Sequence, residues 1–373
     1  MKRTVLFATA FAAAVAAGFA ARAQEAATQA GAKPLFAYTG DVDGVAAGGR
    51  SRSGTYVHVM TGGVQAPLGG GWSVTVQGAW TAGANLSARA IGDVAGVQGP
   101  FNTGNGLWLY EAKANWQSDA AMLQLGRLSA GDALPGVAGM GQFVNSAFSS
   151  NGGAITVNDP GRAATPASTW GAWGRTRAGP IELRGGALLS DPARMTLRKH
   201  GLDFGFHPND GVIAFAEAVA PVGGGLRAGL GAYGDSAHLP AFDGRTVKGD
   251  EGWYLWVEKP APDKGAALSG FAMLQAAPRQ DRNLQPLFLI GGLTWQGLIA
   301  QRPSDALSVG ATAGRFSDRS PLRGWEGLIE ANYRLTINQH LAIRPDLQWV
   351  IHPSGRGGGR DALVAGVQLE AAL

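Results

Sequence analysis

Apolar and polar residues alternate in short segments along most of this chain. In residues 329–337, isoleucine, alanine, tyrosine and leucine occupy the odd positions, and glutamate, asparagine, arginine and threonine occupy the even ones. Residues 341–351 and 363–373 continue the same two-residue period. Successive side chains of a β-strand point to opposite faces. Each segment is therefore predicted to be a strand with one apolar and one polar face.

Aromatic residues mark both ends of some apolar faces. Trp72 and Trp80 share a face in one segment, and Trp108 and Trp116 do so in another. Eight residues at ~3.3 Å span roughly 26 Å of strand. With a tilt of ~40°, this is about 20 Å along a barrel axis, close to the ~25 Å apolar band between the aromatic girdles of outer-membrane barrels. The spacing therefore favours a lipid-facing surface over the core of a soluble sandwich.

The connections alternate between short turns and longer loops, which is typical of outer-membrane barrels with periplasmic turns and outside loops. Seven turns and eight loops join sixteen strands if residues 201–220 form one strand bent near His207–Asp210. We therefore predict an all-β, transmembrane antiparallel barrel of sixteen strands, with both chain ends on the periplasmic side. The turns are predicted at 66–71, 117–120, 178–180, 221–225, 260–265, 301–305 and 338–340, and the loops at 43–54, 81–106, 129–167, 190–200, 235–251, 276–286, 317–324 and 352–361.

The first residues have the pattern of a secretory signal peptide. Lys2 and Arg3 precede an apolar stretch, and small residues at positions 21 and 23 suit cleavage after Ala23. An uncleaved membrane anchor is the alternative. The predicted organisation is a signal peptide at 1–23, a periplasmic spacer at 24–34 and a barrel at 35–373.

Composition excludes several classes of protein. The 58 glycines among 373 residues have no three-residue period, which excludes collagen. The 45% apolar content is too high for a disordered chain, and the absence of cysteine excludes disulfide and thiolate–metal scaffolds. Loss of three basic residues with the leader lowers the net charge from +4 to about +1. No run of basic residues remains to bind nucleic acid.

Two short motifs resemble binding sites without their required context. Residues 229–234 fit G-x-G-x-x-G, but no helix pattern follows them, so a dinucleotide site is not expected. Residues 41–44 (DVDG) match part of a calcium loop that lacks its third acidic residue and closing glutamate. The six histidines show no metal-binding spacing, and H-E-x-x-H and G-x-S-x-G are absent. We expect no enzyme activity, catalytic residue, metal or cofactor.

Mid-strand charges are predicted to face the lumen, because Arg or Lys on the lipid face costs about 2–4 kcal/mol near the midplane. Most of them are expected to be solvated or paired, and some to contact a passing solute. The alternation places on the lumen side Asp41, Glu111, Lys113, Glu182, Arg184, Arg227, Glu330, Arg334, Arg344 and Asp346, with Asp43 close to the end of the first strand.

Several stretches resemble the carbohydrate-selective porins of Gram-negative outer membranes (OprB-type). They are Gly48-Gly49, the segment 123–148 (LQLGRLSAGDALPGVAGMGQFVNSAF), the strand entry P-x-S-x-W-G at 166–171 and the ending 329–355 with E-x-x-Y and P-D-L-Q. The resemblance implies a sixteen-stranded channel for glucose and related sugars. It also implies that loops fold into the lumen and form a narrow, charged constriction. The chain is short for this family, and it ends on Leu373 instead of the usual aromatic residue.

The resemblance directs attention to the longest loop, 129–167. Arg127 and Asp132 match the family motif at its start and are expected to line the channel. Phe143 and Phe148 are expected either to stack on sugar rings or to anchor the loop to the wall. Arg127 shares its face with leucines at 123 and 125, so a bulge or strand end is predicted beside it. Glu217 likewise shares its face with apolar residues, Ile213 and Phe215.

The resulting hypothesis is a passive outer-membrane channel for small carbohydrates. The expected partners are small carbohydrates and outer-membrane lipid, with the oligomeric state left open. A general diffusion porin for small solutes and ions is the main alternative. An outer-membrane barrel enzyme and a secreted β-sandwich are the others, and the former would require a catalytic set that the sequence does not present.

Overall fold

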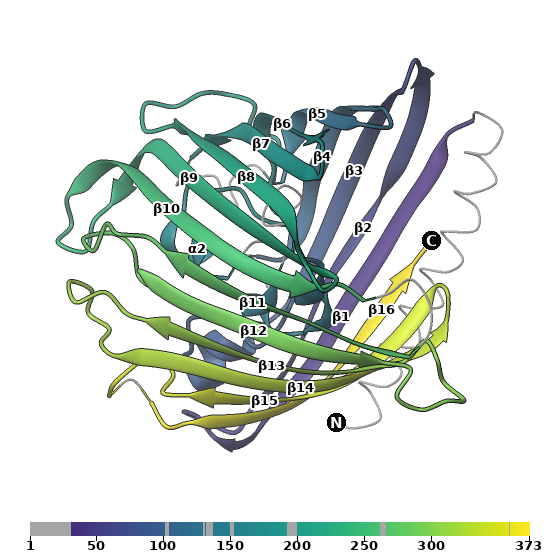
Figure 1. Cartoon of the computed structure of the whole chain (residues 1–373). Helices are drawn as coiled ribbons and strands as arrows, with labels where there is room; N and C mark the ends of the chain where they lie inside the picture. Colours follow the sequence, from purple (N-terminus) through teal and green to yellow (C-terminus); the bar gives the residue numbers. More distant parts are fainter. Residues whose placement is uncertain are drawn as a thin grey trace.

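The computed structural model describes residues 31–100, 104–129, 131, 137–149, 153–191, 200–261, 266–357 and 359–373. Across these residues, sixteen antiparallel strands form a closed barrel in which each strand pairs with its neighbours in sequence and β1 pairs with β16 (Figure 1). The strands are β1 Lys33–Gly48, β2 Gly54–Gly69, β3 Trp72–Gly83, β4 Gly106–Gln117, β5 Ala121–Leu128, β6 Thr169–Ala178, β7 Ile181–Ser190, β8 Gly211–Gly223, β9 Leu226–Pro240, β10 Thr246–Lys259, β11 Ala267–Ala276, β12 Leu287–Gln296, β13 Ala306–Arg315, β14 Trp325–Asn338, β15 Leu341–Ile351 and β16 Ala362–Ala372.

The predicted strand number and the alternation of turns and loops are confirmed. Closure leaves no strand edge unpaired, and this is what allows a β-structure to reside in lipid. Within the described ranges, no helix is long and apolar enough to cross a membrane. The predicted signal peptide at 1–23 lies outside the described residues, as does most of the expected spacer.

Some predicted boundaries are wrong. Residues 201–210 belong to the loop between β7 and β8, so the expected bent strand starts only at Gly211. The strands around the predicted loops 43–54 and 235–251 are longer than expected, which reduces those loops to residues 49–53 and 241–245. The barrel also begins at Lys33, two residues inside the expected spacer. Where strands are longer than expected, cross-strand pairing continues through residues that do not alternate strictly. At 201–210 the pairing of β7 with β8 starts only at Gly211.

The tryptophans at 72 and 80 lie on the outer face, with 37% and 42% of their surface exposed. The prediction for the second pair is wrong. Trp116 pairs with Trp72, but Trp108 pairs with Ala79 and Leu107 pairs with Trp80, because one extra residue lies in β4 opposite the step from Gln77 to Gly78. Because of this bulge, the residues that precede it in β4 point to the opposite faces from those expected. Trp108 is therefore buried inside and Leu107 is 71% exposed outside.

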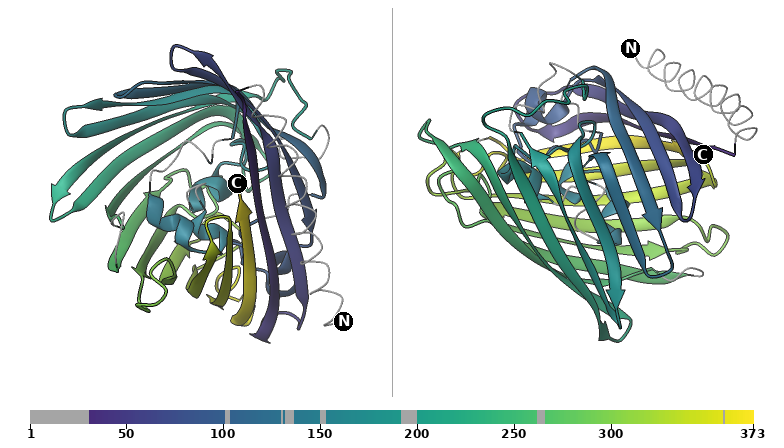
Figure 2. Two further views of the ribbon diagram at one scale, coloured as in Figure 1. Left: turned by 90° about the vertical axis from the view of Figure 1, so that its right-hand side faces the viewer. Right: turned by 90° about the horizontal axis from the view of Figure 1, so that it is seen from above.

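The described parts of two long loops fold into the barrel (Figure 2). The first, residues 84–105, contains the helical turn η1 (Ser87–Ile91). The second, residues 129–168, contains η3 (Ala138–Gln142), η4 (Ser146–Phe148) and α2 (Ala154–Asn158). Buried apolar side chains of these loops pack against inward side chains of the strands. The core of the molecule therefore lies between the loops and the inner wall.

Candidate substrate channel

The second loop is fixed to the wall by a pair of stacked phenyl rings. The ring centroids of Phe143 and Phe148 lie 4.2 Å apart with an interplanar angle of 19°, and Phe271 meets Phe143 edge-on at 6.2 Å. Gly292 and Gly310 pair across β12 and β13, and a Cβ on either would collide with Phe143. Phe148 is 1% exposed. Of the two expected roles, these contacts support loop anchoring.

The Glu330 side chain holds the same loop by binding backbone N–H groups of the loop. Its two carboxylate oxygens accept hydrogen bonds from the N–H groups of Val144 and Asn145 at 2.8 and 2.9 Å. The Asn145 side chain in turn donates to Gln348 Oε1 at 2.8 Å. Charge-assisted hydrogen bonds of this kind are roughly twice as strong as neutral ones. Glu330 is completely buried, so it acts behind the loop and does not face the open lumen.

The first loop is bound by neighbouring wall residues. Asp41 accepts from the Gly99 N–H and from the Gln368 side chain, both at 2.9 Å. Glu326 accepts from the N–H groups of Val94 and Ala95, at 2.9 and 3.2 Å. The expected channel residues Asp41, Asp43, Glu330, Arg344 and Asp346 are all buried under the loops. Asp41, Glu326 and Glu330 therefore position the loops from this part of the wall.

The other predicted lumen charges form ion pairs along the inner wall. Glu111 pairs with Lys113 at 2.6 Å, and Arg184 bridges Glu182 and Glu217 at 2.5 and 3.1 Å. Arg227 pairs with Glu258 at 2.5 Å, and Arg334 with Glu370 at 2.9 Å. The charges of these pairs are two residues apart on one strand, side by side on adjacent strands or, for Arg334 and Glu370, on either side of β15, and at these distances they neutralise one another.

Glu217 needs no bulge to face inward. Ile213 and Phe215 share its face and are buried at 2% and 6% exposure, as part of the core beneath the loops. Trp256 donates to the Glu217 carboxylate at 3.1 Å. The inner face of β8 is apolar here because loop residues cover it. The predicted bulge beside Glu217 was wrong because the prediction assumed that every apolar strand face contacts lipid.

Arg127 lies apart from the lumen residues. It pairs in register with Trp170, on the outward row that includes Leu125. Its guanidinium donates to the carbonyl oxygens of Ser168, Gly201 and Asp203 at 2.6, 2.9 and 2.7 Å. It also lies 5.0 Å from the Phe204 ring centre. The expected channel-lining role is therefore corrected: Arg127 secures the segment 200–206. Asp132 lies outside the described residues.

Replacing Arg127 by alanine is expected to lower the unfolding temperature of the barrel and to leave solute block of the channel unchanged. Three carbonyl groups, one of them buried, lose a charged donor, and each such hydrogen bond contributes about 1.5–3 kcal/mol. The measurements are thermal unfolding in detergent and single-channel current. Arg127→Lys, which retains the charge but not the planar fork, should be intermediate. A weaker sugar block at unchanged unfolding temperature would instead return Arg127 to the channel.

The outer part of the second loop carries a buried carboxyl group. Asp159 accepts from the Gly161 N–H at 3.0 Å and is fully buried. Burial raises the pKa of the Asp159 carboxyl well above its ordinary value, and the nearby Asp235 carboxylate adds to this. The folded protein therefore holds the Asp159 proton more tightly than the unfolded chain does. Its stability falls as the pH rises from the ordinary pKa of an aspartate towards the raised pKa of Asp159. The neighbouring Arg162 offsets part of the penalty.

A cavity of about 420 Å³ lies among the two loops, the strands β1 to β3 and the start of β12. None of its described lining residues is charged. The groups able to form hydrogen bonds include Thr39, Thr81, Ser146, Thr156, Thr165 and Gln285, and Pro100, Pro166 and Phe288 supply apolar surface. Sequence reasoning overlooked these residues because it searched for charges. The serines and threonines of the loops are ordinary loop residues until the fold brings them together.

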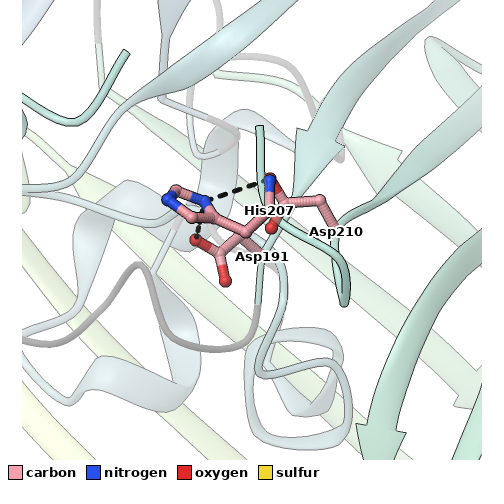
Figure 3. Close-up of side chains that lie close together, drawn as sticks. All are labelled: Asp191, His207 and Asp210. Atoms are coloured by element: carbon pink, nitrogen blue, oxygen red, sulfur yellow. Dashed lines mark hydrogen bonds and ion pairs between the residues drawn. The ribbon is translucent and has the colours of Figure 1, made fainter. Parts of the chain in front are cut away.

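His207 is close to acidic groups at the two ends of the β7–β8 loop (Figure 3). Its Nδ1 lies 3.9 Å from Asp191 Oδ2 and 3.4 Å from Asp210 Oδ2, and its Nε2 lies 3.6 Å from Asp203 Oδ2. Histidine spacing along the sequence did not predict this group, since the partners come from different parts of the loop. The cluster ties the end of β7 to the start of β8, and none of its residues lines the cavity.

Comparisons with known proteins agree with this architecture. The high-pH structure of OprB from Pseudomonas putida superposes with a TM-score of 0.81, at 21% identity over 93% of this chain and 95% of that one. Its low-pH structure gives 0.59, at 16% identity over 93% and 94%. OmpF of Salmonella typhi, in complex with daunomycin, gives 0.55, at 9% identity over 91% and 97%. A search of curated protein sequences found no match.

At these identities the superpositions establish the fold alone. The family model for carbohydrate-selective porins of the OprB family matches residues 68–240 and 240–373, which together are most of the chain. The chain therefore belongs to the OprB family of carbohydrate-selective porins.

Proposed function

We propose that small neutral sugars of the glucose type cross the outer membrane through the cavity between the two inward loops. The observation that carries this proposal is the uncharged, hydrogen-bonding lining of that cavity. Its volume of about 420 Å³ lies within the ~300–1,000 Å³ range of small-molecule sites. Passage is passive, because a water-filled barrel of this family is a transport channel that performs no chemistry. We also propose cleavage after Ala23 and an outer surface in contact with lipid.

The chemistry of the lining suits a sugar. A threonine or serine hydroxyl both donates and accepts hydrogen bonds, as a sugar hydroxyl does. Neutral contacts are individually weak, which allows a solute to enter and leave. The prolines and Phe288 offer apolar surface to the ring face. The ion pairs of the wall are mutually neutralised, so they favour neither anions nor cations strongly.

The test is the current through single channels of the mature chain in a planar bilayer, titrated with glucose. Saturable block is expected in the wild type. The double variant Thr39→Val and Thr165→Val should raise the half-blocking concentration by about 3- to 10-fold for each hydrogen bond to the sugar that it removes, since a neutral hydrogen bond contributes about 0.5–1.5 kcal/mol. Thr246→Val, an exposed position on β10 outside the cavity lining, is the matched control.

Current that glucose changes only through bulk viscosity would contradict the proposal and favour the general-porin alternative. Saturable block that the double variant leaves intact would retain a sugar site but place it elsewhere in the lumen.

A further inference from the structure

Two carboxylates meet over a glycine in the inner wall. Asp43 of β1 and Asp346 of β15 are not on neighbouring strands, but both pair in register with Gly366 of β16 between them. A Cβ at Gly366 would overlap Asp43 Oδ1 and come within 2.7 Å of Asp346 Oδ1. Both oxygens therefore reach into the space of one absent methyl group. Any other residue at position 366 would separate them.

Three of the four oxygens of this pair lack hydrogen-bond partners. Neither oxygen of Asp43 nor Oδ1 of Asp346 accepts a bond of normal geometry from the described residues, although the Gln98 amide lies beside Asp43. The two residues are 2% and 7% exposed. Buried carboxylates without partners are costly, and two like charges at such short range cannot both persist without compensation.

The neighbouring charged groups compensate this cost only in part. Asp41 and Glu330 add further negative charge from β1 and β14. Arg344, two residues before Asp346 on β15, favours the charged form of that carboxyl. Its guanidinium also donates to Gln368 and pairs with Glu370 at 2.9 Å. The open oxygens of Asp43 and Asp346 thus lie close together inside a buried, acidic part of the wall.

We propose that Asp43 and Asp346 bind a divalent cation of the calcium type beneath the first inward loop. Calcium takes six to eight oxygen ligands in flexible geometry and prefers carboxylates. The DVDG motif at 41–44 has the start of such a donor set but lacks further acids in sequence, and the fold supplies Asp346 from the far end of the chain. Asp41 contributes negative charge, since its own oxygens are engaged by Gly99 and Gln368.

The site has a consequence for the channel. Asp41 holds the backbone of Gly99, and Gln98 lies beside Asp43. Gly99 and Pro100 line the cavity. A cation that binds Asp43 and Asp346 relieves their repulsion and so fixes this stretch of the first loop against β1. The inference does not depend on which solute the channel passes.

The test uses the folded mature barrel after removal of metals by chelation. Equilibrium dialysis against radioactive calcium should show saturable binding, and added calcium should raise the unfolding temperature. Asp43→Asn and Asp346→Asn should each reduce the affinity at least tenfold. Asp210→Asn, which changes the separate cluster of the β7–β8 loop, should retain it. Circular dichroism and heat-dependent gel mobility verify that every variant has folded.

Equal calcium binding by the wild type and both folded Asn variants would overturn the proposal. So would an absence of calcium binding combined with an unfolding temperature that falls as the pH rises, because the pair would then share a proton. If a variant does not fold, calcium protection of wild-type Gly99 from amide exchange decides the question: protection supports the site, and its absence contradicts it.

Discussion

Replacement of Gly310 by leucine is expected to detach the second inward loop and to increase single-channel conductance at least twofold. A Cβ at this position would lie 2.6 Å from Phe143 and 2.8 Å from Phe148, so a whole leucine side chain displaces both rings. Overpacking of this kind costs about 1–3 kcal/mol or more. The loop is then without its main apolar anchor, and the cavity that it bounds widens. Block of the channel current by glucose should weaken as the cavity widens.

The barrel itself should tolerate this change. Gly310 lies within β13, where its pairing with Gly292 uses backbone groups that remain available. Gly234→Leu in β9 is the matched control, because nothing lies within 4 Å of a Cβ placed there. Folded Gly310→Leu barrels with wild-type conductance and wild-type glucose block would show that the phenyl pair does not hold the loop.

Removal of the Glu330 carboxylate is expected to loosen the same loop from its other side. Glu330→Ala leaves the N–H groups of Val144 and Asn145 buried without acceptors, at about 1–3 kcal/mol for each. Amide exchange at these two residues should accelerate by roughly tenfold to a hundredfold. Open-channel current noise should rise because the loop samples more positions. Hydrogen exchange followed by mass spectrometry and bilayer recording are the measurements.

Glu330→Gln retains one acceptor oxygen and should fall between the wild type and alanine. The control is Glu251→Ala, which removes an exposed carboxylate paired with Arg279 near the loop end of β10. Unchanged exchange at residues 144 and 145 in the alanine variant would mean that other contacts fix this segment. An equal effect of glutamine and alanine would mean that the negative charge is essential.

Much of the architecture could be predicted because lipid and strand geometry act locally. The two-residue alternation is a direct consequence of pleating, and it identified segments such as 329–337 and 341–351 with nearly correct limits. The predictions failed where a tertiary contact changes what a face meets. The bulge in β4 turns Trp108 inward, and the inward loops make an apolar inner face favourable at Ile213 and Phe215.

The candidate site was less predictable than the fold. Parity alone assigned Asp41, Glu330 and Asp346 to the lumen side, but it could not tell a residue that faces water from one that lies under a loop. Arg127 was chosen through a motif, and its role depends on carbonyl groups up to 76 residues away in sequence. The neutral cavity depends on two loops that have no periodic pattern to read.

The linear pattern of residues is enough to specify a sixteen-stranded outer-membrane barrel, because alternation, turn spacing and outward aromatic residues recur along the chain. The folded molecule alone reveals which inward charges hold loops, which form pairs and where a solute finds room. The physical reason is the range of the interactions. Strand formation depends on neighbours two residues apart. The cavity, in contrast, is assembled from β1 to β3, the start of β12 and two inward loops, and a glycine on β16 allows two distant aspartates to meet.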